Sequence, residues 1–139
     1  MDYRKFGNQY VIRLDRGDEL VESLKGLAKK EGIKLASLTG IGAAGQVTAG
    51  VFDTREKMFK GHTWTGDLEI TSISGNINTM NGETYTHFHV SIADNQGHSF
   101  GGHLTEAVIS GTGELVLTEL PGMVDRIFDE QTGLNIFQF

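Results

Sequence analysis

The sequence predicts an α+β fold, in which a mostly antiparallel β-sheet is flanked by one or two helices. Helical periodicity occurs in one place, over residues 19–31, where apolar residues recur at the spacing of a helix face. Most of the remaining chain alternates as short strands, and 19 Gly with a single Pro agree with many tight turns. No linker, repeat or low-complexity segment interrupts the 139 residues. We therefore expect a single domain over residues 1–139.

The first elements are a strand over residues 9–14 and the helix that follows it. Asp18 is the expected N-cap of this helix, and Gly32 is its expected C-terminal stop. Residues 33–39 alternate as the next strand. The run 40–45 contains three glycines and lacks both the Gly-Lys-Ser/Thr ending of a phosphate loop and the dinucleotide-binding fingerprint, so we expect it to be a structural turn.

The rest of the chain predicts a series of strands linked by hairpins. Their expected ranges are 47–52, 58–64, 68–78, 84–93, 98–104 and 107–120, the last in one or two pieces. Pro121 breaks the pattern, and a short helix or loop with a final strand over 135–139 should close the chain.

Three histidines, His87, His89 and His103, lie on two adjacent predicted strands. Residues two apart on a strand share a face about 6.5–7 Å from each other, which lets two imidazoles converge on one ion. A three-residue loop that ends in Gly97 places His103 opposite His89. This register is favoured over a two-residue loop because it gathers the apolar residues on one face. These residues are Phe88, Val90, Ile92, Phe100 and Leu104.

The preceding hairpin adds polar residues around the histidines. Asn81-Gly82 is a strong hairpin signal, and this turn puts Ser74 beside His89 and Asn76 beside His87. The resulting polar surface is called the histidine face below. It comprises Ser72, Ser74, Asn76, His87, His89, Ser91 and His103. Gly101 falls opposite Ser91, and we interpret it as leaving open space next to the ion.

This arrangement predicts a divalent metal cofactor. The chain has no Cys, so its ligands must be nitrogen or oxygen. Three neutral imidazoles without a fourth protein ligand describe an open site, which water or a small oxygen-rich ligand completes. Zinc is the first choice, with nickel, iron and manganese as alternatives. The competing interpretation is that the three histidines are polar residues on a solvated sheet face. We interpret His98 as a partly exposed hairpin residue beside a turn, and His62, which has no visible ligand partner, as structural too.

Glu69 is the candidate acid or base of this site. A bulge near Thr71 and Ser72 would explain why the apolar parity of this strand changes, and it would turn Glu69 toward the histidine face. A carboxylate there could exchange protons with a ligand. The alternative is a solvated surface charge. The sequence leaves open whether a reaction takes place.

The net charge of −6 argues against nucleic acid as a partner, because phosphate binding requires a basic patch and the basic residues do not cluster. The chain does not start with a signal-like apolar stretch, and it contains no apolar run long enough to span a membrane. The expected location is the cytoplasm.

The segments 66–75, 86–94, 101–104 and 128–134 together resemble the PPC ("plants and prokaryotes conserved") domain family, in its single-domain prokaryotic form. The Thr-His-Phe-His-Val pattern joined to Gly-Gly-His-Leu is the specific part. The resemblance implies a mostly antiparallel sheet flanked by helices, assembled as a homotrimer. Plant members bind DNA largely through an AT-hook, whereas this sequence lacks an Arg-Gly-Arg core and has Asp67 where the plant pattern has Arg. The histidine pattern is also similar to that of acetolactate decarboxylase, in which three histidines hold zinc.

Three functions are compatible with these observations. The first is a metal-dependent enzyme, or a binder of a small oxygen-rich ligand, with Ser74 and Asn76 orienting that ligand and Ser91 and Gly101 adjacent to it. The second is a DNA-binding or transcription-associated protein. The third is a trimeric interaction module in which the metal is structural.

Overall fold

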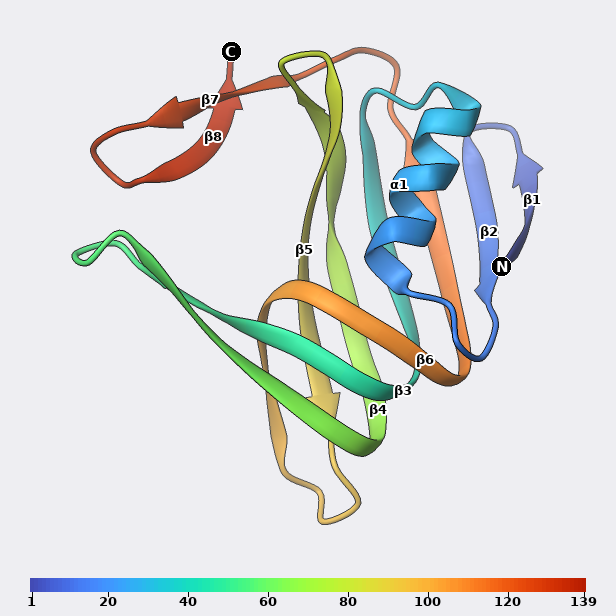
Figure 1. Cartoon of the computed structure of the whole chain (residues 1–139). Coiled ribbons are helices and arrows are strands. Elements are labelled where there is room, and N and C mark those ends of the chain that lie inside the picture. Colours follow the sequence, from blue (N-terminus) through green and yellow to red (C-terminus); the bar gives the residue numbers. More distant parts are fainter.

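The computed structural model describes residues 1–139 and contains one helix and eight strands (Figure 1). The mostly antiparallel sheet that the sequence predicts is present, with a single helix. The elements are β1 (Asp2–Phe6), β2 (Gln9–Leu14), α1 (Leu20–Glu31), β3 (Ala36–Asp53), β4 (Met58–Met80), β5 (Glu83–Ala93), β6 (Ser99–Glu119), β7 (Asp125–Asp129) and β8 (Leu134–Gln138). No helix is long and apolar enough to cross a membrane.

Four of the strands form a closed ring. The main sheet has the order β1-β2-β6-β3-β4-β5, and β6 pairs in addition with β5. The pairings β3–β4, β4–β5, β5–β6 and β6–β3 therefore return to their starting strand, and all four are antiparallel. The ring curves so that one side faces α1 and the other faces the hairpin β7–β8 (Figure 1).

The expected turn at residues 40–45 is wrong, because this run lies inside the long strand β3. A Cβ atom on Gly40 would lie 2.8 Å from the carbonyl oxygen of Glu114, and one on Gly42 would lie 2.6 Å from that of Thr112. The glycines thus permit β3 to approach β6 closely, and the register shifts on either side of Ala44 bend the strand. The separate strands expected at 58–64 and 68–78 likewise form one strand, β4.

Helix α1 ends at Gly32 as expected, in a left-handed conformation with φ of +70°. Its N-cap, however, is Glu19 and not Asp18. The Glu19 carboxylate accepts hydrogen bonds from the backbone N–H groups of Val21 and Glu22, at 3.1 and 2.6 Å. It also accepts one from the N–H of Ala107 at 2.9 Å, which ties the helix to β6. Asp18 is unavailable because it pairs with the N-terminal ammonium group at 2.7 Å.

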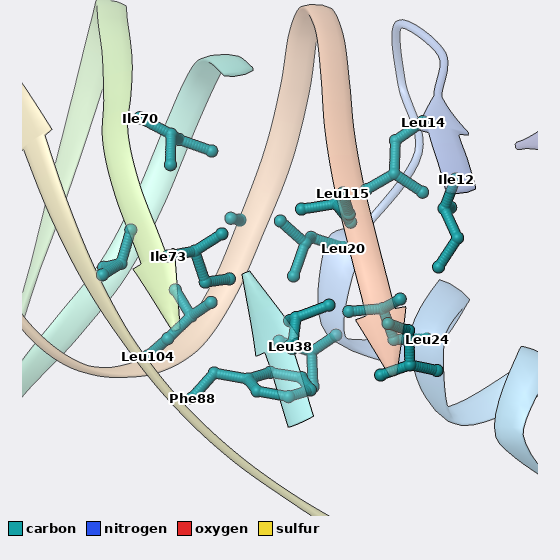
Figure 2. Packing of buried hydrophobic residues seen from close by; sticks show 14 of the residues in the cluster. Ile12, Leu14, Leu20, Leu24, Leu38, Ile70, Ile73, Phe88, Leu104 and Leu115 are labelled. Atoms are coloured by element: carbon teal, nitrogen blue, oxygen red, sulfur yellow. The ribbon is translucent and has the colours of Figure 1, made fainter. Parts of the chain in front are cut away.

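The core lies between α1 and the ring. Leu20 and Leu24 project from the helix toward Leu38, Phe88 and Leu115 of the sheet (Figure 2). The predicted core face of β5 and β6 is buried as expected, with Phe100 only partly buried at its margin. Because successive residues of a strand point to opposite faces, burial of this face directs the histidine face away from α1.

The C-terminal segment differs from the expectation. The final strand is present as β8, but the preceding residues form strand β7, and β1 was not expected either. The hairpin β7–β8 projects on the same side of the ring as the hairpin β3–β4 (Figure 1). Their tips touch, since the Nζ of Lys57 donates a hydrogen bond to the carbonyl oxygen of Glu130. Two hairpin arms therefore frame the face of the ring that α1 does not cover.

Candidate metal centre

The histidines lie where the register analysis predicts. His89 pairs with His103 across β5 and β6. The pairing of β4 with β5 places Ser74 beside His89 and Asn76 beside His87. Both predicted turns produce these registers: Met80 faces Glu83, and the N–H of Asp94 donates to the carbonyl oxygen of His98. The bulge expected near Thr71 is also present, as a register shift between Ile70 and Ser72.

The three imidazoles converge on one point. Their ring centroids are 5.0 to 5.6 Å apart, and one nitrogen from each lies within 4.8 Å of the others. Tetrahedral coordination at about 2.05 Å from each nitrogen requires nitrogen separations of about 3.3 Å, so small ring rotations would complete a site. His62 and His98 lie elsewhere, as expected. His62 packs against Trp64, and Nδ1 of His98 is 3.0 Å from the Asp94 carboxylate.

The pKa values of two of the histidines are lowered, which favours their neutral forms. Burial lowers the pKa of His87 to about 4, and electrostatic repulsion from His103, Arg126 and His89 when they are protonated acts in the same direction. The pKa of His103 is also lowered, first by burial and then by His89 and Arg126. A neutral imidazole offers the nitrogen lone pair that a metal ion requires.

A buried arginine from the C-terminal hairpin reaches the histidines, and the sequence analysis did not identify it. Arg126 of β7 is 6% exposed. Its Nε donates to Oδ1 of Asn78 at 3.1 Å, and its Nη1 donates to the carbonyl oxygen of Asn135. Its Nη2 donates to Oδ1 of Asn76 at 3.0 Å and lies 3.4 Å from Nδ1 of His87. These partners are 9 to 50 residues away along the chain, so no local pattern marks Arg126.

Aromatic rings complete the surroundings. The guanidinium carbon of Arg126 lies 4.7 Å from the ring centroid of Tyr85 and 4.4 Å from that of Phe137. Phe59, near the tip of the β3–β4 arm, makes an edge contact with His103 at 5.9 Å between ring centroids. Each arm thus contributes a side chain against a different histidine.

The other predicted site residues are less close to the centre. The Ser91 hydroxyl is engaged by Thr71 and Ser99, at 3.1 and 3.2 Å. Gly101 has a different role from the open space we expected, because a Cβ atom there would collide with the carbonyl oxygen of Val90. The glycine is needed for close approach of β5 and β6.

Glu69 shares the parity of the histidine face but lies farther along the strand. It pairs with Ala93, four residues beyond His89, which corresponds to about 13 Å. There it lines a groove of about 710 Å³ with Glu114 and Thr112, and no histidine lines that groove. Direct proton exchange between Glu69 and a ligand at the three histidines would therefore have to span about 13 Å.

The donor set fits a borderline divalent ion. All three donors are imidazole nitrogens, which suit zinc, copper, iron and nickel better than magnesium or calcium. No carboxylate joins the group, so the protein supplies three ligands and leaves further positions to a ligand.

Comparison with known proteins agrees with this fold. The profile of the Plants and Prokaryotes Conserved (PCC) domain matches residues 1–121. A candidate DNA-binding protein from Bacteroides thetaiotaomicron is 33% identical and has a TM-score of 0.96, with 99% of this chain and 96% of that chain covered. A PPC protein from Pyrococcus horikoshii is also 33% identical (TM-score 0.90, 99% and 95% covered). A metal-containing protein from Archaeoglobus fulgidus is 30% identical (TM-score 0.88, 100% and 99% covered).

More distant relatives share only part of their length or only the fold. The bifunctional protein GlmU of a Synechococcus strain is 31% identical over 114 residues, which are 81% of this chain and 17% of that protein. The chain thus spans about a sixth of the length of the curated relatives it matches. Acetolactate decarboxylase from Bacillus subtilis is 14% identical (TM-score 0.60, 88% and 57% covered), a likeness of fold alone.

Proposed function

The chain belongs to the Plants and Prokaryotes Conserved family, and from this starting point we propose that it binds a divalent metal ion, zinc by preference, through His87, His89 and His103. The observation that carries the proposal is the convergence of three imidazole nitrogens within 4.8 Å of one another. The lowered pKa values of His87 and His103 support it, because both side chains are ready to bind metal at neutral pH. A structural relative described as metal-containing adds further support.

The open positions would take a small oxygen-rich ligand. A divalent ion held here would polarise a carbonyl or carboxylate oxygen. The β5–β6 pairing sets His89 opposite His103, and the closed ring ties both strands to β3 and β4. Ser74 and Asn76 border His89 and His87 on the neighbouring strand and would orient the ligand.

Metal analysis of protein purified without a histidine tag tests the proposal. We expect one divalent ion per chain after loading and dialysis, and loss of that ion in His87→Ala and His89→Ala. His98→Ala is the matched control, because His98 is an exposed histidine outside the group. Substoichiometric metal in the wild type, or retention of metal by both site variants, would sink the proposal.

We further propose that the chain assembles as a homotrimer. Large apolar side chains are exposed on the two arms and need a partner to bury them. They are Val51, Met58, Phe59, Ile127, Phe128, Ile136, Phe137 and Phe139. Light scattering should give three times the 15.2 kDa of the chain, and Phe128→Asp should reduce it. A monomeric mass for the wild type at micromolar concentration would refute assembly.

DNA binding is the second candidate function, and the name of the Bacteroides relative favours it. The net charge of −6 opposes it, because binding to duplex DNA gains its affinity from phosphate neutralisation. Titration of a labelled duplex at low salt decides the question. Affinity that falls steeply with salt would support DNA binding, and absence of binding at low salt would exclude it.

A further inference from the structure

The Arg126 guanidinium is a buried charge without a counter-charge. Arg126 is 6% exposed, and no carboxylate oxygen lies within 4.0 Å of its guanidinium nitrogens. All its hydrogen-bond partners are neutral: two amide oxygens of side chains, one backbone carbonyl and one imidazole nitrogen. Buried charges in proteins are normally paired, so this arginine calls for an anion.

The surroundings also leave donors unpaired, because the five N–H groups of Arg126 meet four acceptors. A guanidinium has five N–H donors and accepts nothing. Asn78, which accepts from Nε of Arg126, is fully buried, and its own Nδ2 has no acceptor. An acceptor-rich ligand would match this environment better than a donor or an apolar group.

The geometry directs the guanidinium edge toward the histidines. Tyr85 and Phe137 cover the guanidinium, with ring centroids 4.7 and 4.4 Å from its central carbon, which leaves its N–H edge for hydrogen bonds. At this edge Nη2 lies 3.4 Å from Nδ1 of His87. A ligand at the three histidines is therefore within reach of the guanidinium as well.

We propose that Arg126 is the anion-recognition residue of this site and that the ligand is a small carboxylate held jointly by the ion and the guanidinium. The inference rests on the proposed metal-binding function. One carboxylate oxygen would complete the coordination of the ion, and the other would accept a charge-assisted hydrogen bond from Nη2 of Arg126, in place of the 3.4 Å contact that Nη2 makes with Nδ1 of His87. The carboxylate would also offset the electrostatic repulsion between the positive ion and the positive guanidinium, since both lie next to His87.

Cobalt(II) serves as a visible probe, because its absorption spectrum changes when a ligand enters its coordination shell. The experiment titrates cobalt-loaded, full-length protein with acetate, and in parallel with acetamide, which has a similar shape and no charge. For R126M we expect acetate binding to weaken by about 10- to 100-fold, the usual range for one charge-assisted hydrogen bond. Acetamide binding should stay within about twofold. The acetate affinity of R126K, which keeps the positive charge without the planar guanidinium, should lie between those of the wild type and R126M.

Two controls separate recognition from anchoring of the hairpin. Arg126 also attaches β7 to β4, and so does Thr79, whose hydroxyl donates to Asp125 at 3.0 Å. T79V loosens the same attachment and leaves the guanidinium in place, so it should retain the wild-type acetate affinity. If T79V weakens acetate binding as much as R126M does, the role of Arg126 is structural and the inference is wrong.

The outcomes also distinguish failure of this inference from failure of the proposed function. If the wild type does not bind cobalt stoichiometrically, the metal site itself is refuted. If wild type and R126M both bind cobalt and bind acetate equally, only the inference is refuted. If R126M does not fold, the same comparison is made with R126K. Inorganic phosphate that binds more tightly than acetate, with the same dependence on Arg126, would overturn the carboxylate assignment.

Discussion

Replacing Gly101 by alanine should damage both the fold and the histidine site. An added Cβ would collide with the carbonyl oxygen of Val90 and would lie 3.1 Å from the Cα of Ser91, both of which belong to β5. These are backbone atoms in the middle of a strand pairing, so no side-chain rotation can relieve the contact. On the same face, two residues farther along this pairing, His89 lies opposite His103, and separation of β5 from β6 would pull these two imidazoles apart.

The expected loss of stability can be worked out from this contact. Overpacking of a well-packed interior costs about 1–3 kcal/mol. Opening one or two backbone hydrogen bonds adds about 0.5–1.5 kcal/mol each. A central value of about 3 kcal/mol follows. With an unfolding entropy of about 2.1 cal/mol/K per residue, a chain of this length should melt about 10 °C lower.

Thermal unfolding followed by circular dichroism, at fixed protein concentration and without metal, measures this loss. Gly26→Ala is the matched control, because Gly26 is exposed in the middle of α1 and a Cβ atom there meets nothing within 4 Å. That variant should gain about 0.5–1 kcal/mol from helix propensity. A Gly101→Ala protein that melts within 2 °C of the wild type would refute the reasoning about strand approach.

Three further predictions concern protonation, capping and metal. The pKa of His87 is about 4 in the folded protein and 6.5 in the unfolded chain, so the unfolded chain binds the proton first as pH falls. Without metal, the free energy of unfolding should therefore decrease as pH drops from 6.5 to about 4. His87→Asn should weaken this pH dependence. A urea midpoint that is flat over this range would contradict it. Glu19→Ala should cost about 1–2 kcal/mol by urea unfolding and more than Asp18→Ala, unless Asp18 is the true cap. Zinc at 100 times its dissociation constant should add about 2.7 kcal/mol of stability to the wild type and nothing to His89→Ala, and equal gains would exclude the site.

The centre of the site could be predicted from sequence because its determinants are local. Two short turns, at Asn81-Gly82 and at 94–98, place His103 opposite His89 and Asn76 beside His87. Alternation of apolar residues then decides which face is buried. In such hairpins a shift of one residue would expose the whole core face, so the pattern selects one register.

What the sequence analysis missed depends on contacts between distant segments. Arg126 reaches Asn76 and His87, which are 50 and 39 residues away, and nothing near it in the sequence indicates a role. The glycines at 40–45 look like a turn because their purpose, close approach to β6, lies in residues about 70 positions later. Glu19 replaces Asp18 as the cap because the chain terminus, itself distant from the helix in sequence, occupies Asp18.

The closed ring also has a consequence for the order of folding. The strands β4, β5 and β6 follow one another along the chain, and hairpins of this kind form within microseconds. Closure of the ring joins Ala36 to Glu119, a distant pairing that forms slowly. The three histidines can therefore meet before the ring closes, while Arg126 arrives with the last strands. An ion captured by this early meander would speed refolding as well as slow unfolding, and stopped-flow refolding with and without zinc would detect the acceleration.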